Sequence, residues 1–306
     1  MSFPPIQNCR FLTGPTGSGK TGAGVELAQK SDAEIISMDS MALYRGMDIG
    51  TAKPTAVERA AVPHHLVDVI GPHEEYSVAQ YVAAAHEVAA GIRACGRNVL
   101  FVGGTPLYLK ALLRGLFCGP PADPAFRREL QEESRRHDPG WLHARLAEVD
   151  PAAAERLHPN DTRRIIRALE VYEKTGAPMS DWQQQFNKLP EETGNRVYVL
   201  DWPRQELNER IDRRVDAMFA AGLVEEVRGL MALDPPLGKT ARQAVGYREV
   251  IDHLEGACGL DETIALVKQH TRQLAKRQGT WFRSLPESRY VAMGGLLAER
   301  TGPLEW

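Results

Sequence analysis

The sequence predicts an α/β protein: a doubly wound parallel sheet carrying a phosphate-binding loop (P-loop), with an all-helical insertion. Three observations lead to this prediction. A glycine-rich motif, "GPTGSGKT", lies between a short apolar run and a helical pattern. Strand-like and helix-like segments alternate through residue 116, which is typical of a doubly wound core. From Asp123 to about Gly176 the pattern is helical, with no convincing strand.

In the first part of the chain, short apolar runs that end in glycine or polar residues predict buried parallel strands. These runs are Cys9–Thr13, Ala33–Met38, His65–Ile70 and Asn98–Val102. Helical spacing predicts helices at Lys20–Lys30, at Ser77–Cys95 with Ser77 as the cap, and from Pro106 onward.

The later part of the chain changes character and then returns to strand. Asp123-Pro124 and Asp150-Pro151 each resemble a helix cap followed by a first-turn proline. One helix is expected to end at Gly176, and residues 187–195 read as a loop. Arg196–Asp201 has strand character, and the chain is mostly helical from Arg204 onward. We therefore expect residues 1–120 plus 195–306 to form the core and residues 121–194 to form the insertion.

Composition narrows the class of protein. The 306 residues are 43% hydrophobic and 25% charged, with a formal net charge of -3, so no global basic field indicates a nucleic-acid partner. The four cysteines are scattered without a CxxC pair, so they suggest neither a zinc ribbon nor a redox motif and fit a reducing cytosol. The N-terminus does not resemble a signal peptide, and no apolar run is long enough to span a membrane. A cytoplasmic location is expected.

The motif GxxxxGK[ST] predicts a phosphate site. Glycines let several backbone N–H groups point at one anion, Lys20 supplies a positive charge, and the Thr21 hydroxyl is placed to bind Mg²⁺. A chance glycine loop is the alternative, but a strand precedes this motif and a helix follows it. The expected phosphate-binding residues are Gly14, Thr16, Gly17, Ser18, Gly19, Lys20 and Thr21.

Two further polar residues follow strand ends. The apolar strand Asn98–Val102 ends in Gly103-Gly104-Thr105 rather than in the aspartate that NTPases usually place there. Asp39 is the acid at a strand tip nearest the loop. Because the carboxyl ends of parallel strands share one edge, Asp39, Thr105 and the loop should converge on one site. Asp39 would be a general base or a hydrogen-bond acceptor. The alternatives are that Asp39 caps the next turn with Ser40, and that Thr105 caps the helix at Pro106.

Longer segments resemble tRNA dimethylallyltransferases, also called tRNA isopentenyltransferases. They are "GPTGSGKT", "DSMALYRGMDIGTAKP", "VPHHLVD", "VGGTPLYLKALLRGL", "LHPNDTRRIIRALEVYEKTG" and "TRQLAKRQGTWFR". The resemblance implies transfer of a dimethylallyl group from dimethylallyl diphosphate to N6 of the adenosine 3′ to the tRNA anticodon. It implies that the loop and Mg²⁺ hold a diphosphate leaving group, that Asp39 takes the N6 proton, and that Thr105 orients the adenine or bridges to the diphosphate.

The resemblance and the basic helices together predict contacts with the tRNA anticodon stem-loop. The expected residues are Asp39, Ser40, Met41, Ala42, Thr105, Arg127, Arg163, Arg164, Arg167, Arg242, Gln243, Gly246, Tyr247, Arg248, Arg272, Lys276 and Arg277. A solvated helix face is the alternative for any single arginine, and Arg164 or Arg167 could instead pair with Glu170 or Glu173.

Two rival functions fit part of the sequence. A nucleoside or nucleotide kinase would use the loop for ATP and Asp39 for an acceptor hydroxyl. A non-catalytic RNA-binding protein would carry the loop as a relic, although the intact Lys20-Thr21 pair opposes this.

The chain lacks the zinc-finger extension common in eukaryotic relatives, which favours the shorter bacterial form, and a monomer is expected.

Overall fold

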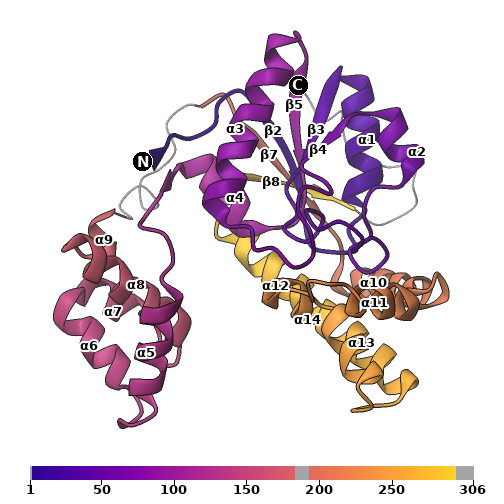
Figure 1. Ribbon diagram of the computed structural model, residues 1–306. Helices are drawn as coiled ribbons and strands as arrows, with labels where there is room; N and C mark the ends of the chain where they lie inside the picture. Colours follow the sequence, from indigo (N-terminus) through magenta and orange to yellow (C-terminus); the bar gives the residue numbers. More distant parts are fainter. Residues whose placement is uncertain (1, 183–192, 294–306) are drawn as a thin grey trace. The chain divides into compact units, whose positions relative to one another are not determined.

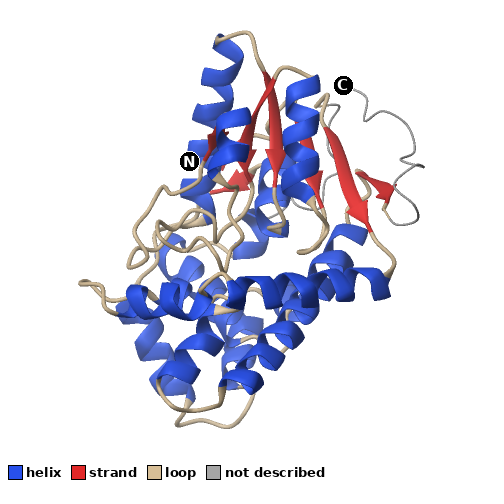
Figure 2. Ribbon diagram, turned by 90° about the vertical axis from the view of Figure 1, so that its right-hand side faces the viewer, coloured by secondary structure: helices blue, strands red, loops and turns tan. Residues whose placement is uncertain are grey.

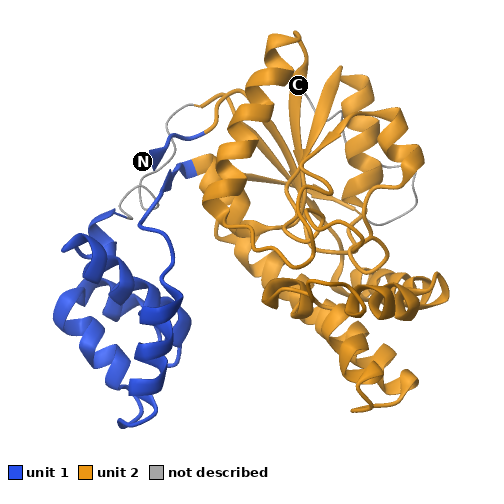
Figure 3. Cartoon of the chain, viewed as in Figure 1, with its two compact units in different colours: residues 1–5, 114–191 blue, residues 6–113, 192–306 orange. Residues whose placement is uncertain are grey.

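The computed structural model describes residues 2–182 and 193–293. The chain divides into two compact units (Figure 3). The core unit comprises residues 6–113 and 192–306, and the helical unit comprises residues 1–5 and 114–191. Each unit is described by itself below.

The core unit is built on a six-stranded parallel sheet in the order β4-β3-β5-β2-β7-β8 (Figure 2). The strands are β2 (Arg10–Thr13), β3 (Ala33–Ser37), β4 (His64–His65), β5 (Asn98–Val102), β7 (Arg196–Asp201) and β8 (Ser288–Ala292). The central strands are buried on both faces, as their continuous apolar runs require. Phe11 of β2 stacks on Phe101 of β5, with ring centroids 4.9 Å apart.

Helices cover both faces of this sheet. The helices α1 (Lys20–Lys30) and α2 (Ala56–Ala61) lie on one face, and α3 (Val78–Ala94) and α4 (Pro106–Arg114) lie on the other (Figure 1). The later helices are α10 (Arg204–Ala220), α11 (Leu223–Met231), α12 (Lys239–Arg242), α13 (Tyr247–Leu254) and α14 (Leu260–Arg283). The long helices α10 and α14 pack together through Ile211, Val215, Val267 and Ala275.

The helical unit contains α5 (Pro124–Ser134), α6 (Trp141–Val149), α7 (Pro151–Arg156), α8 (Thr162–Thr175) and α9 (Met179–Trp182). Its apolar core includes Leu130, Leu146, Ile165 and Leu169. A two-stranded antiparallel ribbon of β1 (Ser2–Phe3) and β6 (Leu116–Phe117) belongs to this unit. Because β1 pairs with β6, residues 1–5 and 114–120 belong to the helical unit. The sequence had predicted all of residues 1–120 in the core. The loop expected at 187–195 lies mostly outside the described residues.

Several expected elements have the predicted bounds, including Lys20–Lys30, Asn98–Val102 and Arg196–Asp201. Ser77, Asp123 and Asp150 cap their helices through side-chain oxygens, as predicted. The strand expected at His65–Ile70 is wrong beyond His65, because Leu66 and Asp68 adopt left-handed backbone conformations that interrupt an extended strand. None of the described helices meets the length and apolarity that a membrane crossing requires.

Candidate functional site

The glycine-rich loop joins β2 to α1 at the carboxyl edge of the sheet. Gly17 and Gly19 have φ angles of 83° and 85°, in the left-handed region that glycine adopts without strain. Gly19 precedes the first residue of α1, and no side chain caps that helix among the described residues. The first-turn N–H groups and the helix dipole therefore favour an anion at this end of α1.

Trp202, which precedes α10, and Arg210 in the second turn of that helix brace this loop. Trp202 donates its indole N–H to the Ser18 carbonyl at 2.9 Å, and Arg210 donates Nε to the Gly17 carbonyl at 2.9 Å. The Arg210 guanidinium lies over the Trp202 ring at 4.1 Å. The Ser18 hydroxyl is buried and has no hydrogen-bond partner within the described part of the chain, which leaves a polar group for a ligand at the loop.

Lys20 points back over the loop. Its Nζ lies 2.9 Å from the Gly14 carbonyl and 2.8 Å from the Pro15 carbonyl. Burial, together with the nearby charge of Arg214, lowers the pKa of Lys20 to about 7, and the carboxylate of Asp39 opposes this shift. An arriving phosphate would restore the positive charge of this ammonium.

Three arginines of α10 face the same loop, and the sequence analysis did not identify them. Arg210, Arg213 and Arg214 line a cavity of about 370 Å³ together with Gly17 and Gly19, which we call the arginine cavity. Within the described residues Arg214 has no ion-pair partner, and its Nη2 lies 3.5 Å from the Thr51 carbonyl. Burial lowers its pKa, while Asp39 opposes the shift. Cations without carboxylate partners beside a phosphate loop suit a polyanionic ligand.

Asp39 follows β3 and lies within electrostatic reach of the loop. Its charge acts on the pKa of both Lys20 and Arg214, so these three groups belong to one site. The Asp39 Oδ1 atom accepts the Met41 backbone N–H at 2.9 Å, which is the local turn contact considered as its alternative role. The second carboxylate oxygen has no hydrogen bond among the described residues, so the turn contact leaves one oxygen for a substrate.

Thr105 holds the turn that carries Asp39. Its Oγ1 accepts the Ser40 backbone N–H at 3.0 Å, and its own N–H donates to the Met38 carbonyl at 3.1 Å. The alternative role as a side-chain cap of α4 is absent from the hydrogen bonds of the described residues. A Cβ on Gly103 would stand 2.1 Å from the Met38 carbonyl oxygen, so only glycine allows β5 to approach β3 this closely.

Gln278 of α14 connects the loop with the end of β5. Its Oε1 accepts the Thr16 N–H at 2.9 Å, and its Nε2 donates to the Gly104 carbonyl at 2.7 Å. Sequence reasoning passed over this residue, although it lies in the basic segment "LAKRQG". α14 therefore helps to position the phosphate loop.

Glu226 of α11 holds the loop that follows Tyr44. Its carboxylate accepts the N–H groups of three consecutive residues, Asp48, Ile49 and Gly50, at 2.7–3.2 Å. It also accepts the Tyr247 hydroxyl at 2.7 Å. Tyr247, which the sequence analysis expected to contact tRNA, is fully buried, and its hydroxyl is bound to Glu226.

The other residues expected to contact tRNA in the core unit differ in their surroundings. Arg242 pairs with Glu255, Arg248 with Glu249 and Arg272 with Asp212. Gly246 precedes α13, and its N–H donates to Glu249. Ala42 is buried, and Ser40 and Met41 are half-buried beside Asp39. Gln243, Lys276 and Arg277 are exposed and without an ion pair among the described residues.

In the helical unit the expected arginines divide into two groups. Arg127 and Arg167 both bind Glu170, which is completely buried, and Arg167 also donates to the Pro120 carbonyl. The alternative of an internal salt bridge is therefore confirmed for Arg167. Arg164 pairs instead with Asp161 at 3.2 Å on the surface, and Arg163 is exposed.

Known proteins match this chain along most of its length. The sequence model of the IPP transferase family matches residues 42–285, and that of the isopentenyl transferase family matches residues 7–63. These matches define the class of protein as an isopentenyl transferase.

The sequences of individual relatives identify the family within this class. The tRNA dimethylallyltransferase of Rhodopirellula baltica is 47% identical, covering 94% of this chain and 88% of that protein. The tRNA dimethylallyltransferase of Symbiobacterium thermophilum is 51% identical, covering 89% of this chain and 85% of that protein. The chain belongs to the tRNA dimethylallyltransferase family.

Solved structures agree with this assignment. The tRNA isopentenylpyrophosphate transferase of Bacillus halodurans superposes with a TM-score of 0.68 at 39% identity, covering 94% of this chain and 90% of that one. A eukaryotic dimethylallyltransferase acting on tRNA superposes with a TM-score of 0.80 at 28% identity, covering 94% of this chain and 74% of that one.

Proposed function

We propose that this protein transfers a dimethylallyl group from dimethylallyl diphosphate to N6 of the adenosine 3′-adjacent to the tRNA anticodon, with diphosphate as the second product. The observation that carries the proposal is the convergence of Lys20, Arg214 and Asp39. Lys20 lies on the glycine-rich loop, Arg214 lines the arginine cavity beside that loop, and both are within electrostatic reach of Asp39. Two cations suit the leaving diphosphate, and a carboxylate suits the incoming amine. Family membership supplies the substrate class.

The P-loop end of the site stabilises the leaving group. The allylic C–O bond breaks, and its electron pair departs on the diphosphate oxygen. The first-turn N–H groups of α1, Lys20 and the arginine cavity place positive charge where that negative charge develops. These groups are fixed by the braces from Trp202, Arg210 and Gln278 before any substrate arrives.

The residues beside the loop fit Mg²⁺ bound mainly through phosphate oxygens. No cluster of three or more His, Cys, Asp or Glu side chains exists in the described ranges, so an all-protein cage is absent there. The Thr21 hydroxyl at the start of α1 and the unpartnered Ser18 hydroxyl are the oxygen ligands that Mg²⁺ prefers. Bound Mg²⁺ would add positive charge at the diphosphate.

The acceptor end requires a base beside N6. The N6 lone pair forms the new bond to the allylic carbon, and the N6 proton passes to the Asp39 carboxylate. The Thr105–Ser40 hydrogen bond keeps the Asp39 turn in place, so Thr105 acts as a positioning residue in addition to any contact with adenine. Extrusion of the adenosine from its stack is expected, because the reacting carbon lies inside the site.

The cations without buried partners are the candidates for tRNA contact. They are Arg163 and the surface-paired Arg164 in the helical unit, and Lys276, Arg277 and the surface-paired Arg242 and Arg272 in the core unit. A monomeric, cytoplasmic enzyme is part of the proposal, and the scattered free cysteines support the cytoplasmic location.

The test combines labelled dimethylallyl diphosphate, Mg²⁺ and an unmodified anticodon stem-loop, with labelled ATP replacing the donor in a parallel reaction. The proposal expects label in the RNA, and its loss when guanosine replaces the target adenosine. Asp39→Asn should lower kcat by about 100-fold or more. Asp32→Asn is the matched control, because Asp32 precedes the other end of β3 and is exposed. Absence of transfer, with phosphate passing from ATP to a small acceptor, would establish the kinase alternative.

A further inference from the structure

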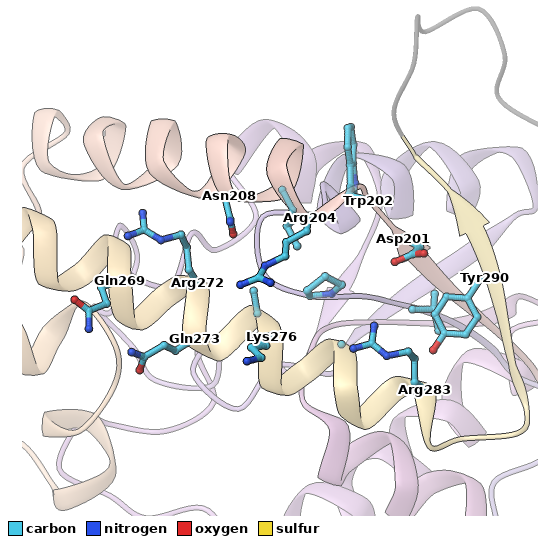
Figure 4. Close-up of a pocket in the computed structure, with 15 residues that line it drawn as sticks. Asp201, Trp202, Arg204, Asn208, Gln269, Arg272, Gln273, Lys276, Arg283 and Tyr290 are labelled. Carbon is cyan, nitrogen blue, oxygen red and sulfur yellow. The ribbon is translucent and has the colours of Figure 1, made fainter.

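A second cavity, of about 390 Å³, lies between α10 and α14 and extends to β7 and β8 (Figure 4). We call it the α10–α14 pocket. Pro15 of the phosphate loop forms part of its wall, but Lys20, Asp39 and Thr105 do not line it. It shares no lining residue with the arginine cavity. The pocket is therefore separate from the proposed transfer site.

The pocket wall carries more positive charge than its own acids neutralise. Arg204 of α10 and Lys276 and Arg283 of α14 surround the same space (Figure 4), and none has an ion-pair partner among the described residues. Arg272 also lines the pocket but is paired with Asp212. Asp201 is the one acid of the lining. Three unpaired cations against one carboxylate favour an anionic ligand, and arginine is suited to phosphate oxygens.

The remaining wall mixes apolar side chains, among them Trp202 and Leu207, with amides, and such a mixture suits a planar ring that also carries polar atoms. Tyr290 of β8 lines the pocket with 44% of its surface exposed, which leaves ring surface for stacking. The amides of Asn208, Gln269 and Gln273 supply both donors and acceptors. A cavity of this size also falls within the usual range of small-ligand sites.

We propose that the α10–α14 pocket is a second nucleotide-binding site, in which Arg204, Lys276 and Arg283 bind a phosphate and Tyr290 stacks on a base. The nucleotide is either one residue of the RNA strand or a free nucleotide, because both present the same phosphate and base. The RNA source rests on the proposed function, whereas the free nucleotide does not.

The experiment measures equilibrium binding to the full chain without any prenyl donor. The probes are labelled ATP and a labelled, unmodified anticodon stem-loop. All variants are made in the Lys20→Ala background, so that the phosphate loop contributes little to ATP binding. The double variant Arg204→Ala/Arg283→Ala removes two phosphate contacts, and Tyr290→Ala removes the stacking surface. Arg289→Ala is the matched control: Arg289 neighbours Tyr290 on β8 and is exposed, but it does not line the pocket.

The double variant should weaken binding of at least one probe by about tenfold or more, since charge-assisted hydrogen bonds are lost. Tyr290→Ala should weaken the same probe, while Arg289→Ala should change it by less than about twofold. Loss confined to the stem-loop identifies an RNA residue as the occupant, and loss confined to ATP identifies a free nucleotide.

Equal affinity in the double variant and in Arg289→Ala, or no binding of either probe in the Lys20→Ala parent, would overturn the proposal. Thermal melting checks that each variant is folded. Because no donor is present, failure of prenyl transfer leaves these binding results intact. Normal transfer with unchanged nucleotide binding would reject the pocket alone.

Discussion

Replacing Glu226 by glutamine should destabilise the core unit through a single loop. The carboxylate accepts the N–H groups of Asp48 and Ile49 on one oxygen, and Gly50 N–H with the Tyr247 hydroxyl on the other. Glutamine keeps one acceptor oxygen and turns an NH₂ group toward donors on the other side, so two of these four hydrogen bonds are lost. At about 1.5 kcal/mol for each bond to a charged group, the low end of the usual range because Glu226 is only half-buried, the expected loss is about 3 kcal/mol.

The measurement is thermal unfolding followed by circular dichroism. A loss of about 3 kcal/mol corresponds to a Tm decrease of roughly 6–12 °C for a unit of this size. Glu225→Gln is the matched control, because Glu225 is the adjacent residue on α11, is 71% exposed and pairs only with Arg228. An exposed pair of this kind contributes about 0–1 kcal/mol, so its Tm should change by no more than a few degrees.

The same substitution should affect catalysis. The loop held by Glu226 leads to the Thr51 carbonyl, which lies 3.5 Å from Arg214 in the arginine cavity. We expect Glu226→Gln to raise KM for the prenyl donor more than it lowers kcat. Equal Tm shifts for Glu225→Gln and Glu226→Gln would refute the energetic reasoning. A normal donor KM at a temperature where the variant is folded would refute the link to Arg214.

Three further predictions concern the charge of Lys20, the buried carboxylate of Glu170 and the close packing at Gly103. Because the pKa of Lys20 is about 7 and a bound diphosphate favours its charged form, donor affinity should fall as pH rises above 7. Calorimetry in buffers of different ionisation enthalpy should then show proton uptake, and a pH-independent affinity would contradict this. Glu170→Gln should destabilise the helical unit by about 3 kcal/mol, because it removes the charge that neutralises two arginines. Hydrogen exchange should accelerate in α5 and α8 but not in β2, and uniform acceleration would count against it. Gly103→Ala should abolish most transfer, because its Cβ would stand 2.1 Å from the Met38 carbonyl oxygen, whereas Gly91→Ala on α3 meets no atom within 4 Å and should be neutral or stabilising. Full activity of Gly103→Ala would show that β3 and β5 can separate there.

The parts of the fold that local sequence determines were predicted well. The phosphate loop, the capped starts of α3 and α5, and the central strands depend on residues within a few positions of each other. The convergence of Asp39 with the loop followed from a general property of parallel sheets, so it required no knowledge of side-chain contacts. The short edge strand β8 was missed, because "SRYVA" is exposed and mixed in polarity and becomes a strand only by pairing with β7.

The arginine cavity could not be predicted in the same way. Arg210 and Arg214 are nearly two hundred residues from the loop in sequence, and they lie in a helix that also carries Glu206, Glu209 and Asp212. Such a mixed pattern is typical of a solvated helix face. Only the return of the chain through β7, next to β2, brings the start of α10 against the phosphate loop.

The same long-range packing decides which cations are free for RNA. Arg163 and Arg167 share a face of α8 by spacing, yet Arg167 is committed to the buried Glu170 whereas Arg163 is exposed. The sequence places both near acids and cannot rank them, because the burial of Glu170 depends on packing between α5 and α8. Loss of Arg167 would therefore leave the buried Glu170 with one of its two arginine partners and reduce the stability of the helical unit before any RNA is added. Loss of Arg163 should weaken RNA binding at unchanged stability, and this separation of the two effects distinguishes a fold-stabilising arginine from an RNA-binding one.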